Sequence, residues 1–351
     1  MWRQRPADKE ADVGEPVLVT GAAGFIGMHV AQRLLAQGYD VVGIDNLNAY
    51  YDPALKVARL AELQRFSNFR FEKVDIAERA PIARLFAAER FPDVVHLAAQ
   101  AGVRHSLSDP YAYAHANLTG FLNVLEGCRQ EGCRHLLYAS SSSVYGANTR
   151  MPFRASDNVD HPLNLYGATK KANELMAHAY SHLFALPATG LRFFTVYGPW
   201  GRPDMAMWLF SDAILHGRPI KLFNHGRMRR DFTFIDDVVE AVVRLVPRPP
   251  SPNHAWSGQA PDPATSRAPW HVYNIGNSSA VEVLEVVRLI EQAVGRTAIA
   301  ELLPMQPGDV PETFADVADL EQAVGFRPST PIAEGIRRFI AWFRRFAKIE
   351  C

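Results

Sequence analysis

Residues 17–45 are VLVTGAAGFIGMHVAQRLLAQGYDVVGID, and this stretch decides the fold class. Val17–Thr20 and Val41–Asp45 are short apolar runs rich in β-branched residues, which is typical of buried strands. Between them, Gly24–Gln37 has the apolar spacing of a helix. A strand, a helix and a second strand in succession predict a parallel crossover unit.

The same alternation continues through the front half of the chain. A chain that alternates strands and helices in this way builds a doubly wound parallel sheet, so we expect an α/β protein of Rossmann type. The further strands are expected at Phe69–Val74, Val94–Ala98, His135–Ser140 and Thr189–Phe194.

Past residue 195 the alternation weakens, and the strand and helices expected there, at 272–275, 281–294 and 331–346, include no sheet large enough to stand alone. We therefore expect a small C-terminal α/β cap that binds the substrate, with the ligand in a cleft beside the main sheet. The expected organisation is a disordered tail at 1–15, a dinucleotide-binding domain at 16–195 with return segments near 232–246 and 271–276, a cap at 196–231 and 277–351, and a surface loop insertion at 247–270, rich in proline, serine and alanine.

Composition excludes several classes of protein. Of 351 residues, 48% are hydrophobic, and 37 lysines and arginines balance 37 aspartates and glutamates, so no excess charge would attract nucleic acid or a membrane surface. No apolar run reaches the roughly 18 residues of a membrane span, and the polar first sixteen residues do not resemble a signal peptide. Cys128, Cys133 and Cys351 form no metal-ligand spacing, which favours a reduced, cytoplasmic compartment and predicts no metal site.

The turn TGAAGFIG, residues 20–27, carries the features of a dinucleotide site. Gly21, Gly24 and Gly27 allow a tight turn, close backbone approach and close helix packing, so that a pyrophosphate can lie at the helix N-terminus. The next strand ends in Asp45, whose carboxylate can accept both ribose hydroxyls and would repel a 2′-phosphate. The sequence therefore predicts NAD rather than NADP.

Other residues at the carboxyl ends of the expected strands could follow the same cofactor. Small residues after the fourth strand would let a nicotinamide ribose approach the backbone, and Asn117 opens a later helix turn that it could order. Each of these residues alone is as consistent with packing or capping as with cofactor binding. The full expected set is Gly21, Gly24, Phe25, Ile26, Gly27, Asp45, Asn46, Asp75, Ile76, Leu97, Ala98, Ala99, Gln100, Asn117, Tyr166 and Lys170.

Tyr166 and Lys170 stand four residues apart on an expected helix, so both project from one face. A phenol has a reference pKa near 10, and lowering it by about three units requires roughly 4 kcal/mol of charge stabilisation. Lys170 and an oxidised nicotinamide could supply this energy, although a tyrosine and a lysine at this spacing also occur as a surface pair. Upstream, Ser141, Ser142 and Ser143 offer hydroxyls that could bond a sugar oxygen.

The motifs TGAAGFIG, HLAAQAGVR, SSSSVYG, YGATKK, LRFFTVYGP and RRDFTFIDD occur in this order over nearly the whole chain. Together they resemble the extended short-chain dehydrogenases/reductases that modify nucleotide sugars. The segments IDNLNAYYDPALK, AQAGVRHS and MQPGDVPETFAD are most similar to UDP-glucuronate 4-epimerases. The resemblance implies a catalytic triad of Ser141, Tyr166 and Lys170.

The implied reaction moves hydride from the sugar C4 to NAD while Tyr166 takes the hydroxyl proton, and returns it to the other face of the 4-keto sugar. For a uronic acid this intermediate is a β-keto acid, which loses carbon dioxide when its carboxyl bond stands perpendicular to the ring carbonyl. By family position, the hydroxyls of Ser142, Ser143 and Thr195 would hold the carboxylate away from that alignment.

Several related activities stay open. Sugar 4,6-dehydratases carry an Asp-Glu pair, and UDP-xylose synthases a glutamate at the second position, where this chain has Ser142 and Ser143, which argues against elimination and decarboxylation. Thr195 replaces the asparagine of UDP-galactose 4-epimerases, so an epimerase of neutral UDP-hexoses is a weaker alternative. A non-catalytic dinucleotide-binding scaffold is the alternative of another class, but such chains usually lack the tyrosine or lysine.

The resemblance also implies how the UDP part is held. Arg202 and Arg230 match family positions near the diphosphate, and Asp309 matches a uridine-ribose contact. Arg104 could serve the sugar or the surface, and Gln306 replaces an arginine of several relatives. The pair Asp236-Asp237 is expected to cap the following helix rather than to bind metal. Relatives commonly dimerise through a helix pair that includes the Tyr166 helix, so a homodimer is expected.

Overall fold

The computed structural model describes residues 15–306 and 308–347, so nearly all of the expected tail and Cys351 lie outside the described residues. The chain divides into two compact units. Unit 1 comprises 1–149, 155–193 and 239–274, and unit 2 comprises 150–154, 194–238 and 275–351. Residues 232–238, which we expected to return to the first domain, fall in unit 2.

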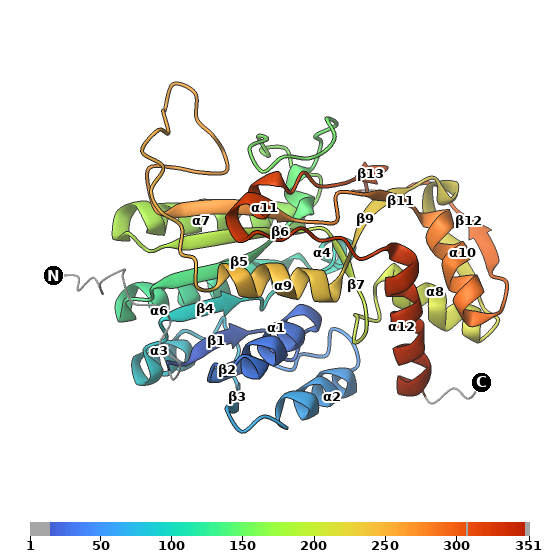
Figure 1. Cartoon of the computed structure of the whole chain (residues 1–351), viewed down its shortest axis with the longest axis horizontal. Helices are drawn as coiled ribbons and strands as arrows, with labels where there is room; N and C mark the ends of the chain where they lie inside the picture. Colours follow the sequence, from blue (N-terminus) through green and yellow to red (C-terminus); the bar gives the residue numbers. More distant parts are fainter. Residues whose placement is uncertain (1–14, 307, 348–351) are drawn as a thin grey trace. The chain divides into compact units, whose positions relative to one another are not determined.

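Unit 1 is built on a seven-stranded sheet in the order β10-β6-β5-β4-β1-β2-β3 (Figure 1). Its strands are β1 (Val17–Thr20), β2 (Val41–Asp45), β3 (Phe69–Lys73), β4 (Asp93–His96), β5 (His135–Ser141), β6 (Ala188–Phe193) and β10 (Trp270–Ile275). The neighbours from β3 through β6 all pair in parallel. The predicted doubly wound α/β fold is confirmed.

The helical elements of unit 1 follow the strands in alternation. They are α1 (Phe25–Ala36), α2 (Pro53–Leu63), α3 (Arg79–Glu89), α4 (His105–Ser108), α5 (Pro110–Tyr113), the π-helix η1 (Ala114–Gly120), α6 (Phe121–Glu131), the 3-10 helix η2 (Ser142–Tyr145), α7 (Leu165–Phe184) and the unit 1 part of α9 (Ile235–Leu245). Alternate strand residues such as Leu18, Val94 and Leu136 point to one face of the sheet and are fully buried. These apolar side chains pack against α3, α6 and α7.

The order of strands places a topological switch at the middle of this sheet. The chain winds from β1 outward to β3 and then crosses back to β4 on the other side of β1. In open α/β sheets, ligands bind outside the carboxyl ends of the strands at such a point. The residues that follow β1 and β4 are therefore placed to meet a ligand.

Unit 2 has a sheet of its own, which the sequence analysis did not expect. Strand β9 (Arg229–Phe234) pairs with β7, β11 and β13, and β8 pairs separately with β12. Its elements are β7 (Thr195–Tyr197), α8 (Ala206–Leu215), β8 (Pro219–Leu222), the 3-10 turn η3 (Phe223–Gly226), β9, the start of α9, β11 (Ala280–Glu282), α10 (Val283–Val294), β12 (Ile299–Leu302), β13 (Glu312–Thr313), α11 (Ala318–Val324) and α12 (Ile332–Phe346).

Asp231 holds this second sheet together. Its buried carboxylate accepts hydrogen bonds from the backbone N–H groups of Asn277, Ser278 and Ala315 at 2.7–3.0 Å, and from the Thr233 hydroxyl. Three separate chain segments thus meet at one side chain. The motif RRDFTF was too short, and too charged at its start, to stand out as a central strand.

Segment 247–270 belongs to unit 1, and most of its residues are exposed or half-buried. Ala264 and Ala268 are buried, and Asn253 N–H donates to the Ser266 carbonyl, so the segment folds back on itself. Among the described residues no helix is long and apolar enough to cross a membrane.

Candidate active site

The turn between β1 and α1 leaves no room for a side chain at its glycines. Gly21 has a positive φ of 71°, and a Cβ added there would lie 2.8 Å from the backbone nitrogen of Ala98. A Cβ at Gly27 would lie 2.0 Å from the Gly21 carbonyl oxygen. The α1 N-terminus has no side-chain cap and no acidic residue in its first turn, so its N–H groups suit an anion such as a pyrophosphate.

Thr20 fixes the spacing between this turn and the end of β4. Its hydroxyl accepts the N–H groups of Leu97 and Ala98 at 3.1 and 3.0 Å, and lies 2.8 Å from His96 Nδ1. The strand expected at Val94–Ala98 ends at His96. The Leu97 N–H still reaches the Thr20 carbonyl at 3.2 Å, whereas the Ala98 N–H bonds the Thr20 hydroxyl. Burial, followed by the charge of Lys170, lowers the pKa of His96 to about 3, so this imidazole is neutral.

Asp45 ends β2 and is buried. Its Oδ1 accepts the Leu47 N–H at 2.8 Å and lies 3.5 Å from Lys56 Nζ, which also donates to Asn48. The sequence analysis missed Lys56, because nothing in its place along the chain shows that α2 folds back onto Asp45. Burial lowers the pKa of Lys56 despite the attraction of Asp45.

Four more of the expected cofactor residues of unit 1 form two hydrogen-bonded groups. Asn46 donates to Asp75 at 2.9 Å, which joins the ends of β2 and β3. Asn117 accepts the Gln100 N–H, and its amide donates to the Gln100 carbonyl and the Thr169 hydroxyl. We expected Asn117 to open a helix turn, but it lies inside η1, where its buried side chain links the loop after β4 to α7.

The expected catalytic residues come together where β5 meets α7. Asn164 caps α7 by accepting the Gly167 N–H, and a Cβ on Gly167 would lie 2.6 Å from the Ser143 carbonyl oxygen. Tyr166, on the first turn of α7, therefore lies beside the serine segment and stacks edge-on against Tyr113. Ser141 Oγ contacts Ser143 Oγ and accepts its N–H, both at 3.2 Å.

Lys170 lies one turn further along α7. Its side chain is buried, and its ammonium donates to the Ala139 carbonyl of β5 at 2.9 Å. Burial lowers the pKa of Lys170 to about 8. The side chain of Lys170 therefore keeps its positive charge at neutral pH, one helical turn from Tyr166. A positive charge near a phenol favours the phenolate.

The arginines expected to bind substrate in unit 2 both pair with carboxylates. Arg230 donates to Asp309 at 3.2 Å and to the Pro311 carbonyl, so a residue assigned to the diphosphate and one assigned to the ribose lie together. Arg202 forms a two-point ion pair with Asp204. Thr195 begins β7, and in unit 1 the exposed Arg104 is the N-cap residue that precedes α4.

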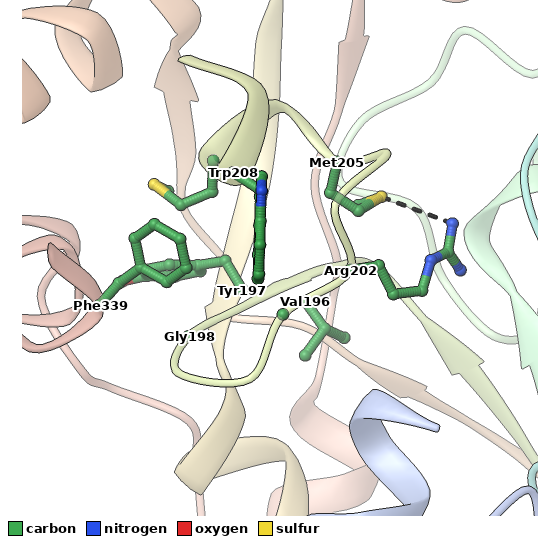
Figure 2. Close-up of a pocket in the computed structure, with 9 residues that line it drawn as sticks. Val196, Tyr197, Gly198, Arg202, Met205, Trp208 and Phe339 are labelled. Carbon is green, nitrogen blue, oxygen red and sulfur yellow. Dashed lines mark hydrogen bonds between the residues drawn. The ribbon is translucent and has the colours of Figure 1, made fainter. Parts of the chain in front are cut away.

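Arg202 also lines a pocket with Val196, Tyr197, Gly198, Gly201, Met205, Met207, Trp208 and Phe339, where it contacts the Met205 sulfur at 3.8 Å (Figure 2). The pocket encloses about 10 Å³, the size of one water molecule, so no sugar or base ring fits inside it.

The acidic pair Asp236-Asp237 lies in the first turn of α9. Asp237 accepts the N–H groups of Ser329 and Thr330, and Asp236 pairs with Arg338, so both side chains bond other segments instead of capping α9. Within the described ranges no cluster of three or more metal-ligating side chains occurs.

Comparison with known proteins decides the family. Residues 17–276 match the model of the NAD dependent epimerase/dehydratase family. The chain belongs to this family. Membership confirms the predicted cofactor, NAD, and the resemblance to nucleotide-sugar epimerases.

Two relatives and one solved structure of this epimerase family cover nearly the whole chain. The CapI protein of Staphylococcus aureus is 53% identical over 95% of this chain and 99% of its own. A probable UDP-glucuronate 4-epimerase of Rhizobium meliloti is 50% identical over 93% and 96%. A crystal structure of UDP-glucuronic acid 4-epimerase from Bacillus cereus, in complex with UDP-glucuronic acid and NAD, matches with a TM-score of 0.82 at 31% identity, over 94% and 99%.

Gly27→Ala should lose bound NAD and lower the melting temperature, because the added methyl would overlap the Gly21 carbonyl and push α1 off the turn. NAD released by heating the purified protein measures the first effect. Gly258→Ala, where the nearest atoms to the new methyl lie 3.9 Å away, is the matched control. Wild-type NAD content in Gly27→Ala would contradict the cofactor site.

Turnover should fall as the pH rises through about 8, because Lys170 then loses the charge that favours the phenolate. The stability of the fold should rise over the same pH range. Lys170 has a pKa of about 10.4 in the unfolded chain. Between the folded and the unfolded pKa the unfolded chain therefore binds more protons, and the free energy of unfolding rises with pH. Urea unfolding of wild type and Lys170→Met across pH 7–10 tests this; equal pH slopes would contradict it.

Proposed function

We propose that the protein inverts C4 of UDP-glucuronate to give UDP-galacturonate, reversibly and with NAD regenerated in each cycle. The observation that carries the proposal is the meeting of Tyr166, Lys170 and Ser141 at the end of β5, next to two serines in place of an acidic pair. The relatives named for this reaction, one of them solved with UDP-glucuronic acid and NAD, support it.

The residues of unit 1 fit NAD. The glycine turn and the α1 N-terminus would hold the pyrophosphate, and Asp45 would accept the ribose hydroxyls, with Asn46, Asp75 and Ile76 at the adenine side. Leu97–Gln100 and Asn117 would border the nicotinamide ribose. When bound, NAD accepts hydride from a secondary alcohol carbon and returns it to a ketone.

The protein groups handle the proton. Tyr166 takes the C4 hydroxyl proton in the first half of the reaction and gives it back in the second. Lys170 keeps the phenolate stabilised through its buried charge. Ser141 would donate a hydrogen bond to the same sugar oxygen.

The substrate residues would divide between the carboxylate and the UDP. We assign Ser142, Ser143 and Thr195 to the carboxylate, and Arg202, Arg230 and Asp309 to the diphosphate and ribose, with Arg104 left to the sugar side. Planar, permanently charged guanidinium groups bond phosphate oxygens at two points, which supports Arg202 and Arg230. To bind phosphate, each would exchange or share its present carboxylate partner, Asp204 or Asp309.

A homodimer and a cytoplasmic location remain part of the proposal. On α6 and α7, Leu122, Leu175 and Leu183 are exposed by 41%, 59% and 68%. Exposed leucines on two neighbouring helices support association of a second copy there.

Proton NMR of the product tests the function. Wild-type protein with UDP-glucuronate should yield a sugar with a small H4 coupling, because C4 inversion turns an axial hydrogen equatorial. Tyr166→Phe should lower turnover at least about 100-fold with UDP-sugar binding retained, since it removes the general base. Conversion of UDP-glucose in preference to UDP-glucuronate would favour a neutral-sugar epimerase, and no conversion of any UDP-sugar would favour the scaffold.

Thr195→Ala or Ser142→Ala should raise the fraction of substrate that loses carbon dioxide. A lost hydrogen bond to a charged group is worth about 1.5–3 kcal/mol, or roughly ten- to a hundredfold in the partition of the 4-keto intermediate. Carbon dioxide from carboxyl-labelled substrate is measured beside epimer formation. If both variants lose epimerisation with no rise in the decarboxylated fraction, these hydroxyls position the sugar instead.

A further inference from the structure

A buried ion pair lies directly behind the catalytic residues. Arg192 of β6 and Glu174 of α7 are 0% and 1% exposed, and they form two bonds, Nε to Oε1 at 2.8 Å and Nη2 to Oε2 at 3.0 Å. Burying two charges costs several kcal/mol each, and apolar residues of similar size often stabilise a fold as well or better. Stability alone therefore does not account for this pair.

The pair connects elements that end at the active site. Ser140 of β5 donates to Glu174 at 2.6 Å, and Arg192 Nη1 donates to the Tyr145 hydroxyl of η2 at 3.1 Å. Tyr145 in turn donates to Asn274 of β10 at 2.6 Å. The four elements β5, β6, β10 and η2 are thus linked to α7 through one carboxylate and one guanidinium.

The spacing along α7 shows what the link fixes. Tyr166, Lys170 and Glu174 are four residues apart in turn, so they share one helix face. Lys170 bonds Ala139 and Glu174 bonds Ser140, which are neighbours on β5 and directly precede Ser141. Two attachments one turn apart prevent α7 from sliding or rotating against β5.

The pair stays ionised across the working pH range. Burial alone would raise the pKa of Glu174, but Arg192 and the hydrogen bonds lower it below its usual range. Burial opposes the charge of Arg192, whereas Glu174 and Tyr145 raise its pKa. The attachment at Glu174 is therefore insensitive to pH, unlike Lys170.

We propose that Glu174 and Arg192 are positioning residues that set the register of α7 against β5, and so place Tyr166 and Lys170 at the reacting carbon. The inference rests on the proposed function for its kinetic consequence. It concerns residues that touch neither substrate nor cofactor.

The test is a double variant, Glu174→Leu with Arg192→Met, which removes both fully buried charges together; Lys171, whose ammonium lies 3.9 Å from Glu174, is 18% exposed and keeps access to water. We expect a folded protein whose kcat falls about 100-fold, as for displacement of a catalytic group by about 1 Å, with KM and NAD content within about threefold of wild type. Asp93→Leu with Arg134→Met is the matched control. That pair is also a two-point bridge, with Asp93 buried and Arg134 17% exposed, but it joins the amino ends of β4 and β5, far along the strands from Ser141. The control should keep its kcat.

A single conservative variant tests the proposal if the double variant does not fold. Glu174→Asp keeps the charge but shortens the side chain by one methylene, so it should lower kcat by shifting α7. Wild-type kcat in either folded variant would overturn the proposal. Equal losses of kcat in the Glu174/Arg192 and Asp93/Arg134 double variants would also overturn it.

A crystal structure of a Glu174 variant separates this proposal from the proposed function. We expect the bond from Lys170 to Ala139 to be lengthened or broken, whatever sugar the enzyme accepts. If the wild-type protein does not convert UDP-glucuronate, the proposed function is wrong. The position of α7 in the variant structure still tests whether Glu174 sets the register of α7 against β5. An unchanged bond from Lys170 to Ala139 would overturn the positioning role.

Discussion

The close approach of α1 to the turn before it is the constraint on which the cofactor half of the molecule depends. A methyl group on Gly27 would lie 2.0 Å from the Gly21 carbonyl, so only glycine lets the helix begin there. With the helix in that place, its unbonded N–H groups point across the turn, and Gly21 can lie against Ala98. Thr20 then bonds Leu97 and Ala98, which brings the end of β4 to the same point. Gly21, Gly27 and the Thr20 hydroxyl together bring β1, α1 and the end of β4 to one point that suits a dinucleotide.

The parts of the structure that follow from local pattern were predictable. β1 and β2 occur at the expected residues, and α1, β3 and β5 differ by a residue or so at their ends. Their apolar residues follow the spacing of a strand or of a helix between clear turns, which leaves little choice. The unit 2 sheet was not predictable in this way. β9 begins with Arg229 and Arg230, and its pairing with β11 and β13 depends on the buried Asp231, which collects N–H groups from residues 277–315. No local periodicity reports such long-range bonds.

Some side-chain contacts of the site were predictable from the sequence, and others were not. The four-residue spacing of Tyr166 and Lys170 showed that they share a helix face, and the same rule reaches Glu174, which the sequence analysis did not use. Arg192 stands within an apolar strand, where a charge must have a buried partner, but the sequence does not say which carboxylate that is. Lys56 beside Asp45 and Asp309 beside Arg230 likewise depend on how distant segments meet. The types of residue could be predicted from their chemistry, whereas their partners are known only from the fold.

The choice among reactions depends on side chains carried by a fixed backbone. Gly167 packs against the Ser143 carbonyl, Ser141 caps the 3-10 helix that follows it, and Tyr145 at the end of that helix is tied to Arg192 and Asn274. The backbone of residues 141–145 is therefore held from both sides whatever side chains stand at 142 and 143. At the sugar site proposed above, a carboxyl group at either position would add an acid or base without moving the phenol. Two hydroxyls add hydrogen bonds and no second acid or base, which suits a reaction that returns hydride to the intermediate and loses nothing from it.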